Sequence, residues 1–117
     1  MFSKLQDSVL IVSSAKKKIS STAGHQFMND HPYAGQRYKL AEKNLEVILN
    51  ALKTGNTGEF IRVTENEALG LHSLMMSSDP GFFLLEPGTL QIINKIRDFR
   101  EKTGMFLSFT LDAGPNV

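Results

Sequence analysis

Residues 34–76 read "AGQRYKLAEKNLEVILNALKTGNTGEFIRVTENEALGLHSLMM" and predict two consecutive helices. Five apolar residues recur at spacings of three and four and form one stripe on the first helix: Tyr38, Ala41, Leu45, Ile48 and Leu52. Gly55 is a common helix stop, which predicts that the first helix covers about 34–54. Asn56 and Glu59 have capping-box spacing, so a second helix should begin at once and run to about Met76.

Two strands and a third long helix are predicted after this hairpin. Residues 82–86, "FFLLE", form a plausible short strand, and Pro87 suits the first position of a helix that stops at Gly104. Residues 105–112, "MFLSFTLD", then alternate as a strand does. Its two faces would carry Met105, Leu107, Phe109 and Leu111 on one side, and Phe106, Ser108, Thr110 and Asp112 on the other.

The residues before the hairpin add a further strand and a short helix. Residues 7–14, "DSVLIVSS", hold four apolar residues in a row, as a central strand does, and Ser20, Ser21 and Thr22 can cap a short helix. The predicted fold class is therefore α+β, with helices packed on one face of a small, mainly antiparallel sheet. We expect residues 1–117 to form a single domain, whose exposed sheet edge near Val117 would allow two copies to pair as a homodimer.

Composition excludes several classes of function. A net charge of +1 gives no electrostatic argument for nucleic acid or an anionic membrane as a partner, and no apolar run approaches the roughly 20 residues of a membrane span. There is no cysteine, so disulfides and thiol chemistry are absent. This composition suits a cytoplasmic protein.

Asp112 is the first candidate for chemistry, because it ends the last predicted strand where Gly114 opens space beside the backbone. A carboxylate there could orient or deprotonate a hydroxyl, or stabilise positive charge in a transition state. On pattern alone, the commoner interpretation is a turn aspartate that bonds its own backbone.

Ser20, Ser21 and Thr22 are the second candidates. Hydroxyls and free N–H groups at a helix start can receive phosphate or carboxylate, although simple N-capping is the commoner role of such residues. His25 and His31 lack metal-ligand spacing, so no metal site is predicted. His72 lies mid-helix among apolar residues, where a satisfied, half-buried histidine is commoner than a ligand or a base.

Three segments in this order resemble the second half of diphosphomevalonate decarboxylases, enzymes of the GHMP kinase superfamily: "DSVLIVSSAKKKISSTAGH", "ENEALGLHSLMM" and "FTLDAGPNV". The resemblance implies a truncated, ferredoxin-like GHMP C-terminal domain whose N-terminal ATP-binding domain is absent. It implies an ATP- and Mg²⁺-dependent conversion of mevalonate 5-diphosphate to isopentenyl diphosphate. This portion alone would not catalyse that reaction. Asp112 would be the catalytic aspartate, and Ser20, Ser21 and Thr22 would lie on the substrate and phosphate side of the cleft. His25 stands where familiar members have methionine.

Two alternatives stay open from the sequence. A phosphomevalonate decarboxylase or a mevalonate 3-kinase would share much of this domain, and the aspartate motif favours a decarboxylase. A non-catalytic, stand-alone interaction domain is the alternative outside the enzyme class.

Overall fold

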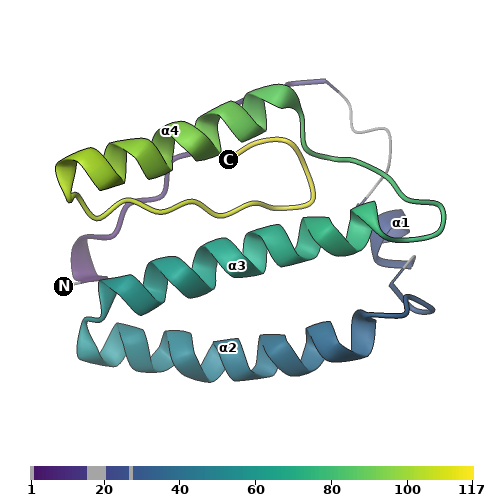
Figure 1. The fold of residues 1–117 in the computed structure, drawn as a ribbon, viewed down its shortest axis with the longest axis horizontal. Helices are drawn as coiled ribbons and strands as arrows, with labels where there is room; N and C mark the ends of the chain where they lie inside the picture. Colours follow the sequence, from purple (N-terminus) through teal and green to yellow (C-terminus); the bar gives the residue numbers. More distant parts are fainter. Residues whose placement is uncertain (1, 16–20, 27) are drawn as a thin grey trace.

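The computed structural model describes residues 2–15, 21–26 and 28–117 (Figure 1). Its elements are a 3-10 turn, a short helix and three long helices: η1 (Phe2–Lys4), α1 (Ser21–Gln26), α2 (Ala34–Thr54), α3 (Thr57–Met76) and α4 (Pro87–Thr103). Helix α3 lies between α2 and α4, and α2 runs antiparallel to it. No helix in these described ranges is long and apolar enough to cross a membrane.

The boundaries of the α2–α3 hairpin are those that the sequence predicts. Gly55 adopts a left-handed φ of 75°, and its N–H bonds the carbonyl of Ala51. Glycine tolerates this conformation without strain, which is why the helix ends there. The Asn56 side chain accepts a hydrogen bond of 3.1 Å from the N–H of Glu59 and so caps α3.

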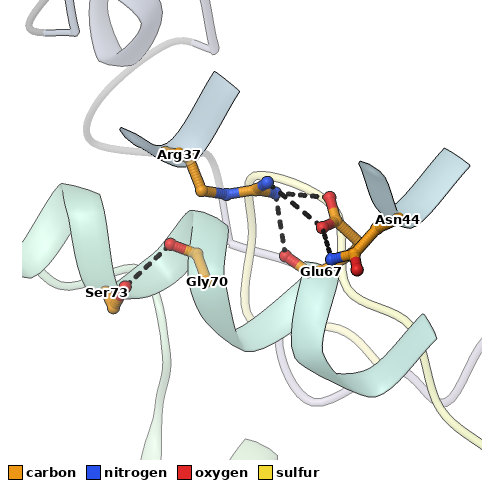
Figure 2. A network of polar contacts seen from close by, with 5 residues as sticks. All are labelled: Arg37, Asn44, Glu67, Gly70 and Ser73. Carbon is orange, nitrogen blue, oxygen red and sulfur yellow. Dashed lines mark hydrogen bonds and ion pairs between the residues drawn. The ribbon is translucent and has the colours of Figure 1, made fainter. Parts of the chain in front are cut away.

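A polar network holds α2 against α3 (Figure 2). The guanidinium of Arg37 donates to both carboxylate oxygens of Glu67, at 3.2 and 2.6 Å, and Nδ2 of the buried Asn44 donates to Oε1 at 2.7 Å. These contacts lower the pKa of Glu67 although desolvation opposes them. The stripe predicted on α2 is only partly buried, since Leu45 remains 58% exposed.

The C-terminal segment packs between α3 and α4 (Figure 1). The largest buried cluster joins all three parts through Ala68 of α3, Ile93 and Ile96 of α4, and Phe109 and Leu111 of the segment. A second polar network fixes the start of the segment. Arg100 donates to Oε1 of the buried Glu65 at 2.5 Å and to the carbonyl of Leu107 at 2.8 Å.

The prediction of an α+β fold with a small antiparallel sheet is wrong for the described part of the chain, which contains helices and no strands. A sheet needs a ladder of paired backbone groups. Between the N- and C-terminal segments, the described backbone pairing is the exchange between Leu10 and Val117, at 2.7 and 3.2 Å. Beyond that pair, a groove of about 820 Å³ lies among residues of 4–10 and 106–110, and no described backbone hydrogen bond joins the two segments there.

Candidate active site

Asp112 begins a turn of residues 112–115, here called the Asp112 turn. The preceding segment buries Phe109 and Leu111 to 3% and 7% exposure, whereas Thr110 and Asp112 are exposed. This confirms the predicted alternation at residues 109–112. The apolar side chains anchor the segment to the helices, and the Asp112 side chain consequently lies on the face that is open to solvent.

His72 of α3 holds the beginning of the turn. Its side chain is 1% exposed, and its Nε2 lies 2.9 Å from the backbone carbonyl oxygen of Asp112. A carbonyl oxygen only accepts, so Nε2 must carry the hydrogen. Burial lowers the pKa of His72, while the hydrogen bond to Asp112 and the charge of Asp112 oppose this shift. The net lowering favours a neutral imidazole that donates to the turn.

Thr89, in the first turn of α4, holds the end of the turn. Its side chain is completely buried, and its hydroxyl donates to the carbonyl of Pro115 at 2.5 Å. The same oxygen accepts from the N–H of Glu86 at 3.2 Å, so the hydroxyl is satisfied in both roles. The turn is thereby attached to the N-terminal end of α4 as well as to α3.

Asn116 connects the turn to the N-terminal segment. Its Oδ1 accepts hydrogen bonds from the N–H groups of Val12 and Ser13, at 2.9 and 3.1 Å. These residues precede the lysine-rich run that leads to α1. One side chain therefore attaches residues 12 and 13 of the N-terminal segment to the residue that follows the Asp112 turn.

The second predicted group is described only in part. Ser20 lies outside the described residues, Ser21 begins α1 without a described side chain, and Thr22 is exposed on α1. Phe82 links α1 to the Asp112 turn. A Cβ atom added at the buried Gly24 would lie 3.6 Å from Cζ of Phe82, and Phe82 packs with Ala113 and Met75.

Among the described residues, no three histidine or acidic side chains gather as they would around a metal ion. The lysine-rich run lies outside the described part of the chain. The chemistry assigned to this chain below therefore involves its carboxylate and hydroxyl groups, and no step through a metal bound by it.

The sequence pattern singles out Asp112 as a candidate but does not reveal the groups that hold it. The prediction that His72 is a satisfied, half-buried histidine is confirmed for its hydrogen bond, whereas the side chain is buried almost completely and contacts Asp112, which was not predicted. Thr89 carried a usable signal, because it lies three residues after Glu86 at a helix start opened by Pro87. Its second bond, to Pro115, depends on tertiary structure and has no local signal.

Solved structures of one class of enzyme share this fold. The mevalonate pyrophosphate decarboxylase from Streptococcus pyogenes and a mevalonate diphosphate decarboxylase from Legionella pneumophila each match with a TM-score of 0.85 and 30% identity, over 92% of this chain and 34% of theirs. The diphosphomevalonate decarboxylase of Ganoderma lucidum is 30% identical over 116 residues. The family model of the mevalonate 5-diphosphate decarboxylase C-terminal domain matches residues 8–117, and the chain belongs to this family.

These matches confirm the resemblance seen in the sequence, and they also set its extent. The alignment covers 93% of this chain but 29% of the Ganoderma lucidum enzyme. The chain thus spans less than a third of the length of that relative. A further solved structure, described as MDDEF in complex with MVAPP, AMPPCP and magnesium, is 28% identical with a TM-score of 0.84.

Proposed function

We propose that this chain forms the part of an ATP-dependent decarboxylase that contains the catalytic aspartate, Asp112. The enzyme converts mevalonate 5-diphosphate to isopentenyl diphosphate. The observation that carries the proposal is the family match over residues 8–117, which includes the whole Asp112 turn. The similar protein solved with MVAPP, an ATP analogue and magnesium supports the same substrates. Since the chain spans under a third of the Ganoderma lucidum relative, activity requires groups beyond those described.

Asp112 is the proposed catalytic residue. In the reaction, ATP phosphorylates the tertiary 3-hydroxyl, and loss of this phosphate together with carbon dioxide leaves the double bond of the product. A carboxylate beside the hydroxyl can orient it for in-line attack on the γ-phosphate. The same negative charge favours the positive charge that develops at the tertiary carbon when phosphate departs. The exposed position of Asp112, on a turn anchored to two helices, suits both roles.

Ser20, Ser21 and Thr22 are the proposed contacts to substrate or nucleotide phosphate. Hydroxyl donors of this kind can bind anionic oxygens without a formal charge. The packing of Gly24 near Phe82, and of Phe82 with Ala113, supports a position of α1 on the same side of the molecule as the Asp112 turn. A cytoplasmic location belongs to the same proposal. The homodimer expected from an exposed sheet edge is not proposed, because the described residues form no sheet.

The test is a chimera in which residues 8–117 replace the matching segment of the Legionella pneumophila enzyme, with which this chain superposes at a TM-score of 0.85. With ATP and magnesium, we expect phosphate and carbon dioxide release from mevalonate 5-diphosphate. Mevalonate and its monophosphate are assayed in parallel, since preference for either would assign one of the sister activities instead.

Asp112→Asn should lower the turnover of the chimera by about 10² or more with little change in KM, as expected for loss of a catalytic carboxylate. Asp98→Asn is the matched control, because Asp98 is an exposed carboxylate on α4. Near-normal turnover of Asp112→Asn would remove Asp112 from the mechanism. A folded chimera that binds mevalonate 5-diphosphate without turning it over would contradict the proposed function.

A further inference from the structure

The Asp112 turn is attached to the protein at both of its ends by buried side chains from different helices. His72 of α3 donates to the carbonyl of Asp112, and Thr89 of α4 donates to the carbonyl of Pro115. Between them, the N–H of Gly114 donates to the same Asp112 carbonyl at 2.9 Å. The Asp112 carbonyl thus receives one donor from the turn itself and one from α3.

Both anchoring side chains are polar groups that are almost completely buried. His72 and Thr89 are 1% and 0% exposed, and Ala68 and Met75 on the neighbouring turns of α3 are buried as well. An apolar residue would fill either position without desolvating a polar group. The polar atoms of both residues bond the backbone of the turn, so their chemistry serves the turn as well as the packing of the core.

We propose that His72 and Thr89 are positioning residues that together set the orientation of the Asp112 carboxylate, an inference that rests on the catalytic role proposed for Asp112. The two carbonyls define the ends of the turn, and fixing both restricts the backbone dihedral angles between them. The direction in which the Asp112 side chain leaves the backbone is then set by α3 and α4. Catalytic groups need placement within about 0.5 Å, and rigid elements provide this better than loops do.

The first test measures amide hydrogen exchange in this chain by NMR. The N–H of Gly114 reports the turn, and the N–H of Ala68, inside α3, reports the stability of the core. In His72→Leu, which cannot donate, exchange at Gly114 should accelerate about tenfold more than at Ala68, the effect expected for one lost hydrogen bond. In His72→Gln, whose side-chain amide can donate to the same carbonyl, most of this difference should disappear.

Val63→Ala is the control. Val63 is buried in the first half of α3, so its truncation should destabilise the core without removing a hydrogen bond to the turn. This control should accelerate exchange at Gly114 and at Ala68 by the same factor. If His72→Leu gives the same ratio as Val63→Ala, His72 is merely part of the core and the proposal fails. Thr89→Val, which keeps the shape of the side chain, gives the same readout if His72→Leu does not fold.

The second test uses the chimera. His72→Leu and Thr89→Val should lower kcat about tenfold or more with KM changed less than about threefold, because misplacement of a reacting group acts on the chemical step. His72→Gln, which can still donate to the Asp112 carbonyl, should retain most of kcat. Ser73→Ala, which removes an exposed hydroxyl from the next position of α3, should leave both constants unchanged. Equal losses in Ser73→Ala would overturn the proposal. An inactive unsubstituted chimera contradicts the proposed function, whereas the exchange experiment still decides whether the two residues fix the turn.

Discussion

Two glycines at equivalent helix positions should respond in opposite directions to the same substitution. Gly35 and Gly88 are each the second residue of a long helix, α2 and α4. A Cβ atom at Gly35 would meet no atom within 4 Å, whereas at Gly88 it would lie 2.8 Å from Cγ1 of Val12. Real carbon atoms do not approach this closely, so Val12 or the helix must shift.

The distances around the two glycines set the expected changes in the free energy of unfolding. Gly→Ala reduces the conformational entropy of the unfolded chain, so Gly35→Ala should stabilise the protein by about 0.4–1 kcal/mol. Gly88→Ala gains the same term but adds overpacking that costs about 1–3 kcal/mol, which leaves a net loss of up to about 2.5 kcal/mol. Urea denaturation measures both values, provided that the slope with denaturant is unchanged.

A third variant assigns the loss to the contact itself. In a Val12→Ala background the obstructing methyl is gone, so Gly88→Ala should become neutral or stabilising. The double-mutant cycle should then give a coupling energy of about 1 kcal/mol or more between the two positions. If Gly88→Ala stabilises the protein as Gly35→Ala does, or if Val12→Ala does not rescue it, the N-terminal segment does not pack on α4 as described.

Three further outcomes are expected from the polar contacts. Thr89→Val should cost about 1–2 kcal/mol in urea denaturation, most of it from the lost bond to Pro115, and a cost under about 0.5 kcal/mol would contradict that bond. Arg37→Met and Glu67→Gln should show a coupling energy of about 1 kcal/mol in a double-mutant cycle, a value already discounted for the partial exposure of the pair. Because folding lowers the pKa of Glu67, this stabilisation should be complete above pH of about 4.3 and should be lost as the pH falls through the pKa of Glu67 in the folded state. The pKa of His72 is lowered as well, so below pH of about 6.5 the unfolded chain binds the proton first and stability should fall, by at most about 1.4 kcal/mol per pH unit, until the pH passes below the folded-state pKa. His72→Gln should remove this dependence, and an unchanged pH profile in that variant would assign it elsewhere.

The helices could be predicted from sequence because their signals are local. Gly55 and Gly104 both adopt positive φ, of 75° and 68°, at the ends of α2 and α4, and Asn56 caps α3 as its spacing from Glu59 predicted. Pro87 begins α4. Each signal involves residues within a few positions of one another, so no knowledge of the rest of the fold is needed.

The buried side of α2 was harder to predict, because a stripe of apolar residues does not show which neighbour it meets. Asn44 and Ala51 are buried, and Arg37 is joined to Glu67 across the helix pair. The apolar Leu45, only one residue from Asn44, remains 58% exposed. The side of α2 that meets α3 therefore carries a polar network as well as Ala51, and hydrophobic periodicity alone does not identify it.

The predicted strands failed for a different reason. Alternation correctly separated the buried Phe109 and Leu111 from the exposed Asp112, whereas Met105 and Leu107, predicted on the same face as Phe109, are 58% and 37% exposed. Alternation reports burial of one face, but a strand also requires a backbone partner, which lies far away in sequence. In the described part of the chain, Leu10 and Val117 supply one such exchange, and beyond them a groove separates the two segments where further pairing would lie.

This failure changes the explanation of how the acid is positioned. The sequence argument placed Asp112 at the end of a strand, so the regular geometry of a sheet would have directed its side chain. In the structure this task falls to side chains: His72 and Thr89 hold the two ends of the turn, and Asn116 attaches it to Val12 and Ser13. All three bond backbone groups, which have the same geometry whatever residue carries them. The direction of the carboxylate should therefore be more sensitive to these three side chains than to substitutions within residues 105–108, because the bond from Arg100 in that stretch is made to the backbone carbonyl of Leu107 and lies before the turn.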